Sequence, residues 1–293
     1  MILLLAGTSD AKEIAFALHE NKLPMMASVS HKNAATDYIE KNIPVRIGPL
    51  DSTEMSNFIR ENNINIVADA THPFAEATHQ TAMQAAKDSN VTYIRYERQN
   101  TEIKEEYKNS DKLFITDSYE ECVSQTKELI HEHESHKNKN VFDDYNGKDN
   151  NKEETQNKNK KESKCVVMLT TGTKNLEMFT DAFLKEEQVE TIARVLPRSE
   201  SILECERLGV KQSNIVAIQG PFSEEMNRLF LEKYRVNILV TKESGKEGST
   251  QEKIKAAIDL GIRVVLIARP KLEFHNIFHT RDDILTEIKK ITK

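Results

Sequence analysis

Five short segments combine small residues, hydroxyl groups and charged side chains in a pattern that suits anion binding. Each follows an apolar run and precedes an amphipathic segment. Glycine and hydroxyl residues at such junctions leave backbone N–H groups available to an anion at the start of a helix. The segments read GTSD at 7–10, DATHPF at 69–74, TTGTKN at 170–175, QGPFS at 219–223 and TKESGKEG at 241–248.

The first junction has the residues of a phosphate-binding turn. Gly7 lets the backbone turn and approach a phosphate, and Thr8 and Ser9 carry hydroxyl groups. Asp10 with Glu13 fits a capping box, so a plain strand-to-helix turn is an equally good interpretation. GxGxxG, GxxxxGK[ST], GxSxG and Tyr-xxx-Lys patterns are absent from the sequence, which disfavours kinases, hydrolases and short-chain dehydrogenases.

The second junction brings a carboxylate, a hydroxyl and an imidazole together. Asp69, Thr71 and His72 lie within four positions of one another. Carboxylate and imidazole groups are the usual agents of proton transfer. The alternative interpretation is that Asp69 or Thr71 only caps the helix expected at 75–89.

Basic residues recur near the ends of the expected strands. A guanidinium can bind a carboxylate or a phosphate through two parallel hydrogen bonds, and a lysine adds a mobile charge. Each residue alone could be a solvated charge, and Arg95 and Arg98 could pair with Glu97 or Glu102. Together they favour an anionic ligand. The set is Arg95, Arg98, Lys174, Arg194, Arg198, Lys242 and Arg269.

These junctions require strands and helices that alternate along the chain. Continuous apolar runs are typical of parallel strands covered on both faces. We expect strands at 2–6, 25–30, 43–47, 65–69, 91–95, 112–116, 165–170, 189–194, 213–218, 236–241 and 263–268. We expect helices near 10–20, 34–41, 53–62, 75–89, 118–130, 175–184, 199–208, 223–234, 250–260 and 281–291.

The alternation predicts an α/β protein with two Rossmann-like, doubly wound parallel-sheet domains and a cleft between them. The expected N-terminal domain spans 1–97, a connector spans 98–111, and the C-terminal domain spans 112–293. Residues 131–164 interrupt the second domain with 8 Lys, 8 Asp/Glu and 7 Asn. Such a composition predicts a disordered insertion.

The composition excludes several classes of partner and environment. The chain has 293 residues and a net charge of −6, so it lacks the overall charge of a nucleic-acid-binding protein. Its apolar runs are too short to span a membrane. Three scattered cysteines form no CxxC pair, which disfavours disulfides and a structural metal site and favours the cytoplasm. The oligomeric state cannot be read from the sequence.

Several segments resemble the precorrin-6A reductase family, which includes the cobalt-precorrin-6A reductases of cobalamin synthesis. The similarity covers nearly the whole chain except 131–164. The segments are ILLLAGTSDAKEIA (2–15), IPVRIGPL (43–50), ADATHPFA (68–75), VTYIRYERQ (91–99), LTTGTKNL (169–176), ARVLPRSESILECERLG (193–209), NIVAIQGPFSEEMN (214–227) and LVTKESGKEGSTQEKIKAA (239–257).

The resemblance implies NAD(P)H-dependent reduction of one double bond of a tetrapyrrole macrocycle. It makes Lys242, His72 and Asp69 candidate proton donors. Candidate cofactor-binding residues are Gly7, Thr8, Ser9, Thr171, Gly172, Lys174, Gln219, Gly220, Ser244 and Gly245. Candidate substrate-binding residues are Thr71, Arg95, Arg98, Arg194, Arg198 and Arg269.

Coenzyme choice depends on the end of the second expected strand. An NAD-specific fold usually places an acidic residue about 20 residues after its phosphate loop. Ser30, His31 and Lys32 stand here instead, where the family usually has a glycine-arginine-threonine stretch, and they favour NADPH over NADH. Two other functions remain open, namely a non-catalytic NAD(P)-sensing module and another NAD(P)-dependent oxidoreductase of a polyanionic molecule.

Overall fold

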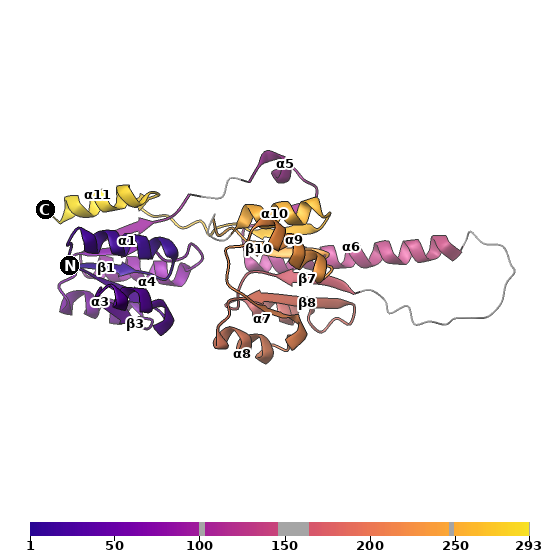
Figure 1. The fold of residues 1–293 in the computed structure, drawn as a ribbon, viewed down its shortest axis with the longest axis horizontal. Helices are drawn as coiled ribbons and strands as arrows, with labels where there is room; N and C mark the ends of the chain where they lie inside the picture. The colour runs from indigo at the N-terminus through magenta and orange to yellow at the C-terminus, as the bar shows by residue number, and fades with distance from the viewer. Residues whose placement is uncertain (100–102, 146–163, 246–248, 293) are drawn as a thin grey trace. The chain divides into compact units, whose positions relative to one another are not determined.

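The computed structural model divides the chain into two units, each built on a parallel β-sheet with helices on both faces (Figure 1). Unit 1 comprises Met1–Asn100 and Pro270–Lys293, and unit 2 comprises Thr101–Arg269. The structure describes residues 1–99, 103–145, 164–245 and 249–292.

The sheet of unit 1 has six strands in the order β12-β5-β4-β1-β2-β3. All neighbouring pairs are parallel. The central strands are fully buried because helices cover both faces, which explains their continuous apolar sequences. The strands are β1 (Ile2–Leu5), β2 (Met25–Val29), β3 (Val45–Ile47), β4 (Ile66–Asp69), β5 (Thr92–Tyr96) and β12 (Ile277–Phe278).

The sheet of unit 2 has the order β6-β11-β10-β7-β8-β9, again with all neighbours parallel. Counted from β1 in unit 1 and from β7 in unit 2, both sheets run 3-2-1-4-5 with a sixth strand beside the fifth. The strands are β6 (Leu113–Thr116), β7 (Cys165–Leu169), β8 (Val189–Val195), β9 (Ile215–Ala217), β10 (Ile238–Lys242) and β11 (Arg263–Ile267).

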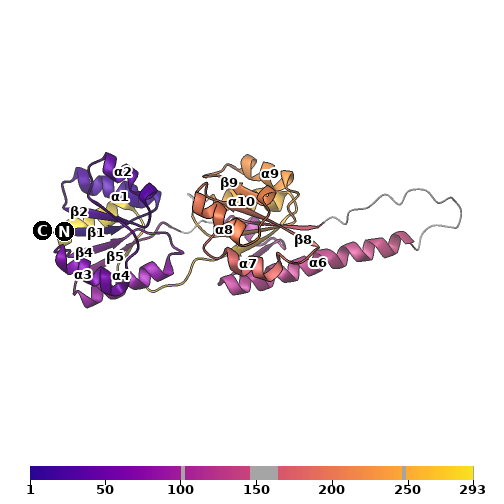
Figure 2. The ribbon, with the colours of Figure 1, turned by 90° about the horizontal axis from the view of Figure 1, so that it is seen from below.

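The helices form a layer on each face of each sheet. In unit 1, α1 and α11 cover one face and α3 and α4 cover the other. Figure 2 shows α9 and α10 on one side of the second sheet and α6 and α7 on the other. The helices of unit 1 are α1 (Ser9–Glu20), α2 (Thr36–Glu40), α3 (Ser52–Glu61), α4 (Glu76–Asp88) and α11 (Arg281–Ile291). Those of unit 2 are α5 (Glu105–Lys108), α6 (Tyr119–Tyr145), α7 (Leu176–Phe183), α8 (Ser199–Arg207), α9 (Glu224–Lys233) and α10 (Thr250–Asp259).

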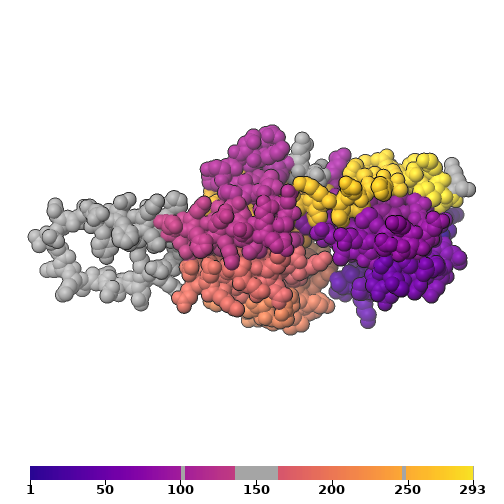
Figure 3. Space-filling view, turned by 180° about the vertical axis from the view of Figure 1, so that it is seen from behind, coloured from indigo at the N-terminus to yellow at the C-terminus, as the bar shows by residue number. Residues whose placement is uncertain are grey.

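The two doubly wound parallel sheets confirm the predicted fold class, but the C-terminal segment does not follow the predicted division at 112–293. Residues after Arg269 belong to unit 1, where β12 pairs with β5 and α11 packs on the sheet. Helix α11 buries Ile284, Leu285 and Ile288 in the same core as the residues of α1. Figure 3 shows this segment, in yellow, lying along the indigo and purple surface of unit 1.

The boundaries of the predicted insertion also change. Helix α6 continues to Tyr145, so the part of 131–164 up to that residue is helical and not disordered. The apolar periodicity that predicts the helix stops near 130, and polar residues with adequate helix propensity extend it. Residues 146–163 of the predicted insertion lie outside the described residues.

The predicted connector at 98–111 contains a short helix, α5, which the sequence analysis missed. Tyr107 of this helix is buried in the core of unit 2 together with residues of α9 and α10. The described part of the connector after residue 102 is therefore packed on the second unit.

The return of the C-terminal segment predicts that a substitution in α11 destabilises unit 1. Replacing Ile288→Ala leaves a cavity in the core of unit 1, so the free energy of unfolding should fall by about 2–5 kcal/mol. The exposed neighbour Lys289→Ala is the matched control and should change it by less than about 0.5 kcal/mol. Urea unfolding followed by circular dichroism measures both. Equal stability of the two variants would contradict the assignment of α11 to this core.

Candidate functional site

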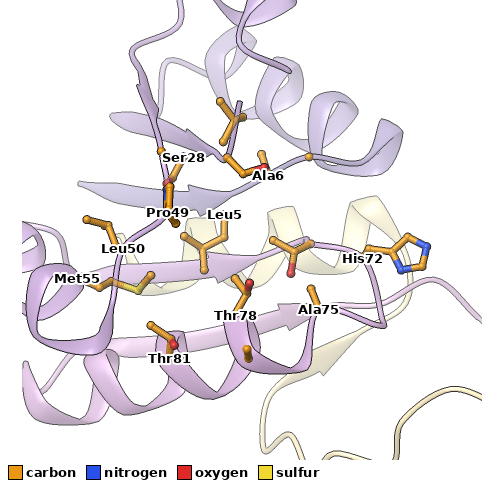
Figure 4. Close-up of a pocket in the computed structure, with 16 residues that line it drawn as sticks. Leu5, Ala6, Ser28, Pro49, Leu50, Met55, His72, Ala75, Thr78 and Thr81 are labelled. Atoms are coloured by element: carbon orange, nitrogen blue, oxygen red, sulfur yellow. The ribbon is translucent and has the colours of Figure 1, made fainter. Parts of the chain in front are cut away.

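A cavity of about 420 Å³ lies at the carboxyl ends of the central strands of unit 1. Leu5, Ala6 and Gly7 from the end of β1 line it together with Ser28, Val29 and Ser30 from β2 and its end. Figure 4 shows Pro49 and Leu50 on one side and Thr78 and Thr81 of α4 on the other. The cavity lies where the strand order reverses between β1 and β4, the usual ligand position in open α/β sheets.

The loop between β1 and α1 supplies the inner wall of this cavity. Gly7 has a φ of +139°, which other residues rarely adopt, and a side chain there would meet no atom within 4 Å. Thr8 caps α1 by accepting from the Ala11 N–H, and its hydroxyl donates to the Ala70 carbonyl at 2.9 Å. The cap is therefore Thr8 and not the predicted Asp10. Ser9 is exposed in the first turn of the helix.

The predicted cluster at 69–74 forms a buried hydrogen-bond network centred on Asp69. The carboxylate accepts from the Thr71 N–H at 3.0 Å and from the Thr71 hydroxyl at 2.7 Å. It also accepts from the Tyr93 hydroxyl at 2.9 Å and from His79 Nδ1 at 2.7 Å. These bonds fix the turn that leads from β4 into α4.

Arg95 completes the network from β5. Its side chain is 0% exposed and donates to the Asp69 carboxylate at 3.1 Å, to the Asp69 carbonyl at 3.1 Å and to the Thr71 carbonyl at 3.0 Å. It also lies 3.4 Å from the Glu97 carboxylate. The phenyl ring of Phe274, from the C-terminal segment, covers its guanidinium at 5.5 Å. Arg95 thus holds the loop, and these contacts do not favour the predicted role in binding a substrate carboxylate.

The electrostatics keep Asp69 ionised. Burial alone would raise the pKa of this carboxyl, but the hydrogen bond from His79 and the charge of Arg95 hold the pKa well below its usual range. A carboxylate that stays ionised at neutral pH and accepts this many hydrogen bonds is a poor proton donor. The geometry therefore favours a positioning role for Asp69 over the predicted catalytic one.

His72 lies at the rim of the cavity, on the loop before α4 (Figure 4). Its Nδ1 accepts a hydrogen bond from the Phe74 N–H at 3.2 Å. This bond places the ring proton of the neutral imidazole on Nε2. His72 is half-buried and belongs to the loop that Asp69 orders.

Arg98 forms an ion pair within unit 1. Its guanidinium lies 2.6 Å from the carboxylate of Asp10, at the start of α1. The pair links the end of β5 to the loop after β1, with both side chains mostly buried. This geometry agrees with an intramolecular pair, and Asp10, which the sequence did not suggest, is a partner among the described residues.

In unit 2, the corresponding reversal point lies between β7 and β10. Thr171 is buried there, and its hydroxyl has no hydrogen-bond partner among the described residues. Gly172 has a φ of +80°, and a side chain there would meet no atom within 4 Å. Lys174 is exposed. Burial, and then the charge of Lys174, lower the pKa of Lys242 to about 8.

The loop after β10 is tied to its own surroundings. The Ser244 N–H donates to the Thr250 hydroxyl at 3.2 Å, and the Gly245 N–H donates to Glu243 at 3.1 Å. Glu243 also forms a buried ion pair with Arg269. These contacts do not favour the predicted use of Ser244 and Gly245 in phosphate binding or of Arg269 in substrate binding.

The remaining predicted residues lie near β8 and β9. Arg194 is buried over the rings of Phe222 and Phe230, while Arg198 is half-buried at the start of α8. Gln219 is exposed in the loop after β9. A side chain at Gly220 would lie 3.0 Å from the ring of Phe222, so this glycine permits close packing.

Four contributing residues were missed by the sequence analysis. His79 and Tyr93 hold Asp69, and Arg46 donates to the Pro49 carbonyl at 3.1 Å in the cavity wall. Lys253 is buried in the first turn of α10. Arg46, Tyr93 and Lys253 fall inside segments that carry the family resemblance, so those segments held a signal. His79 has the spacing of an ordinary core position on a helix.

Among the described residues, no group of three or more His, Cys, Asp or Glu side chains is placed to hold a metal ion. None of the helices in the described part of the chain is long and apolar enough to cross a membrane.

The Asp69 network predicts a pH-dependent loss of stability. Asp69→Asn leaves Arg95 buried without its charged partner, so the variant should be less stable at pH 7 by about 3–5 kcal/mol. The lowered pKa of Asp69 means that its stabilising effect is present above about pH 4 and is lost as the pH falls further. The difference between wild type and variant should therefore shrink in acid. Urea unfolding at several pH values measures it.

The exposed Asp111→Asn is the matched control and should change the free energy of unfolding by less than about 0.5 kcal/mol at every pH. A difference between wild type and Asp69→Asn that stays constant from neutral pH into strong acid would contradict the lowered pKa.

The comparisons with known proteins cover nearly the full chain and agree with one another on the family. The family model described as precorrin-6x reductase CbiJ/CobK matches residues 1–289. The cobalt-precorrin-6A reductase of Priestia megaterium is 34% identical over 293 residues, with all of both chains covered. The cobalt-precorrin-6A reductase of Methanocaldococcus jannaschii is 30% identical, covering 99% of this chain and 98% of that protein.

A solved structure, CobK precorrin-6A reductase, has the same fold. It covers 99% of this chain and 96% of its own, with a TM-score of 0.69 and 20% sequence identity. The fold, the full-length family match and the identity to curated reductases lead to one conclusion. The chain belongs to the precorrin-6x reductase family CbiJ/CobK and is an oxidoreductase.

Proposed function

We propose that this chain catalyses the NAD(P)H-dependent reduction of one macrocyclic double bond of precorrin-6A or cobalt-precorrin-6A, in the biosynthesis of the cobalamin ring. Family membership supports the substrate class. The structural observation that carries the proposal is the cavity at the strand reversal of unit 1, where doubly wound sheets bind dinucleotides. Membership in a reductase family disfavours a non-catalytic sensing module.

The wall of that cavity fits part of a dinucleotide. The loop at Gly7 presents backbone with open space in front of it, next to the N-terminus of the twelve-residue helix α1. A phosphate at such a helix start is stabilised by the first N–H groups and the helix dipole. A volume of about 420 Å³ accommodates one half of the coenzyme.

The residues at the end of β2 favour NADPH over NADH as the coenzyme. Ser30 lines the cavity, and His31 and Lys32 follow it as exposed residues. A lysine and an imidazole stabilise a 2′-phosphate, which NADH lacks. When bound, the reduced nicotinamide supplies the hydride, and the protein positions it against the accepting carbon.

Two residues fit the delivery of the accompanying proton. His72 carries its neutral-form proton on Nε2, at the rim of the cavity. Lys242, with a pKa near 8, keeps most of its charge at neutral pH and can release a proton readily. Asp69 acts through the loop that holds His72 and does not itself transfer the proton.

The substrate is a polycarboxylate, because tetrapyrrole precursors of this kind carry acetate and propionate side chains. Arg198 and Lys174 are the predicted cations best placed to meet such groups, since Arg95, Arg98 and Arg269 are paired within the protein. Relatives named as cobalt-precorrin-6A reductases are 24% to 34% identical to this chain, and two named as precorrin-6A reductases are 24% and 26% identical, so the higher identities support the cobalt form.

The cysteines support a reducing compartment. Cys122, Cys165 and Cys205 are all buried and free. We therefore propose a cytoplasmic location, which suits an enzyme that consumes a reduced nicotinamide.

An anaerobic assay with purified full-length protein tests the function. Loss of the reduced-nicotinamide absorbance should require addition of precorrin-6A or cobalt-precorrin-6A, and NADPH should give the higher kcat/KM. Folded protein that oxidises neither NADPH nor NADH with either substrate would contradict the proposal.

A pair of variants makes the coenzyme test specific. Lys32→Gln should lower the ratio of kcat/KM for NADPH to that for NADH by roughly tenfold, because one charge-assisted hydrogen bond to the 2′-phosphate is lost. Lys87→Gln, an exposed lysine at the end of α4, should leave the ratio unchanged. Equal ratios in both variants would place the 2′-phosphate elsewhere.

A further inference from the structure

Unit 2 contains two buried cations near the start of α10. Arg194, on β8, is 8% exposed, and Lys253, in the first turn of α10, is 6% exposed. The guanidinium of Arg194 lies over the Phe222 ring, and the Phe222 N–H donates at 3.2 Å to Ser249, the residue that precedes α10. Buried cations are normally paired with carboxylates, since an unpaired buried charge is costly.

The strand register places a third polar group on the same face of the sheet. Ala193 of β8 and Val240 of β10 both pair with Leu169 of β7. Arg194 and Thr241 therefore lie in the next row of the sheet, and side chains of one row point to the same face. This face is the one covered by α9 and α10, which bury Leu231 and Ile254 against the sheet.

The described residues give these three groups few partners. Arg194 donates to the Asn227 side-chain oxygen at 3.0 Å and lies over the Phe222 ring at 4.8 Å. Within the described part of the chain, no carboxylate forms an ion pair with Arg194 or Lys253. The buried hydroxyl oxygen of Thr241 likewise has no hydrogen-bond partner there.

Two carboxylates approach Lys253 without neutralising the site. Glu243 forms its ion pair with Arg269, and Glu252 is the residue beside Lys253 on α10. Burial and the charges of Arg194 and Lys242 together outweigh both glutamates and lower the pKa of Lys253 to about 7. The local electrostatic field is therefore positive.

We propose that Arg194, Lys253 and Thr241, at the N-terminus of α10, form a binding site for one oxyanion of a bound ligand. An oxyanion would neutralise the two cations, accept from the Thr241 hydroxyl and interact favourably with the positive end of the helix. The inference rests on the proposed function for its ligands, which offer two sources of this chemistry: a phosphate of the dinucleotide or a carboxylate of the tetrapyrrole. Lys253 and Thr241 are new to the site, whereas Arg194 was already a candidate.

The site makes a specific prediction about protons. At pH 8 most Lys253 amines are neutral, and a bound oxyanion favours the charged form. Binding should therefore take up a proton, and affinity should fall as the pH rises above 7. Lys242 has a lowered pKa in the same range, so a variant is needed to separate the two lysines.

Isothermal titration calorimetry of the full-length protein tests the proposal. The probes are NADP⁺ and uroporphyrin III, a tetrapyrrole with eight carboxylates, each titrated at pH 8 in two buffers that differ in ionisation enthalpy. Lys253→Met should weaken one of the two probes by about tenfold or more and reduce its proton uptake, while the other probe changes less than twofold. Weaker binding of NADP⁺ by Lys253→Met assigns the oxyanion to a phosphate. Weaker binding of uroporphyrin III assigns it to a carboxylate.

The matched control is Lys185→Met, an exposed lysine of unit 2, which should bind both probes like wild type. Arg194→Gln is the second variant and should weaken the same probe as Lys253→Met. Melting temperature should not fall in Lys253→Met, because the change removes a buried charge near other cations. Unchanged affinity and proton uptake in Lys253→Met would overturn the proposal, as would a lower melting temperature with unchanged affinities.

This result is separable from the proposed function. If the wild-type protein reduces its substrate and Lys253→Met binds both probes with unchanged affinity, the oxyanion site is wrong and the reductase proposal stands. If the wild-type protein shows no turnover but Lys253→Met still loses affinity for one probe, the reductase proposal is wrong and the oxyanion site stands.

Discussion

The buried carboxylate of Asp69 is the constraint on which the candidate site of unit 1 depends. It lies at the end of β4, beside the strand reversal, and accepts from Thr71, His79, Tyr93 and Arg95. Each donor comes from a different position in the chain, so one carboxylate fixes the turn into α4, the start of that helix and the adjacent strand. An ion pair at this depth stabilises little by itself, but removing one partner leaves the other charge buried and unpaired. The arrangement therefore defines the geometry of the 69–74 loop.

The C-terminal segment connects this network to the sixth strand of the sheet. Phe274 packs against His79, Tyr93 and Arg95, a few residues before β12 pairs with β5. In unit 2 the sixth strand is β6, which comes before β7 in the sequence, whereas in unit 1 it is β12, which comes last. Both sheets thus have the same strand order, although the sixth strand comes before the other five in the sequence of unit 2 and after them in unit 1. The repeated order gives each unit one reversal point at which a ligand can bind.

Local sequence patterns were sufficient for most of the fold. Apolar runs such as Ile2–Leu5 and Cys165–Leu169 predict buried parallel strands because both faces are covered, and the structure confirms them. The two-residue strand β12 has no such run, and its position depends on a long-range pairing that no local pattern contains. The same limit applies to α11, whose amphipathic pattern predicts a helix but not which sheet it covers.

The site was harder to predict than the fold. Strand order predicts that Gly7 and the 69–74 loop meet at one edge of the sheet, and both line the cavity. Residue type alone does not distinguish an arginine that binds a ligand from one that holds a loop, and Arg95 and Arg269 are paired inside the protein. Lys253 was missed because a lysine on a helix is normally exposed, and only the packing of α10 shows that it is buried.

The central claim is that the dinucleotide binds at the strand reversal of unit 1. Hydrogen–deuterium exchange of the full-length protein, with and without saturating NADP⁺, tests it most directly, because backbone amides that contact a phosphate exchange more slowly. We predict slower exchange in the segments 7–10 and 70–75, which contribute Gly7, Thr71, His72 and Ala75 to the cavity and lie at the starts of α1 and α4. Slower exchange confined to the segments 170–176 and 249–253 of unit 2, with no change in unit 1, would contradict the account.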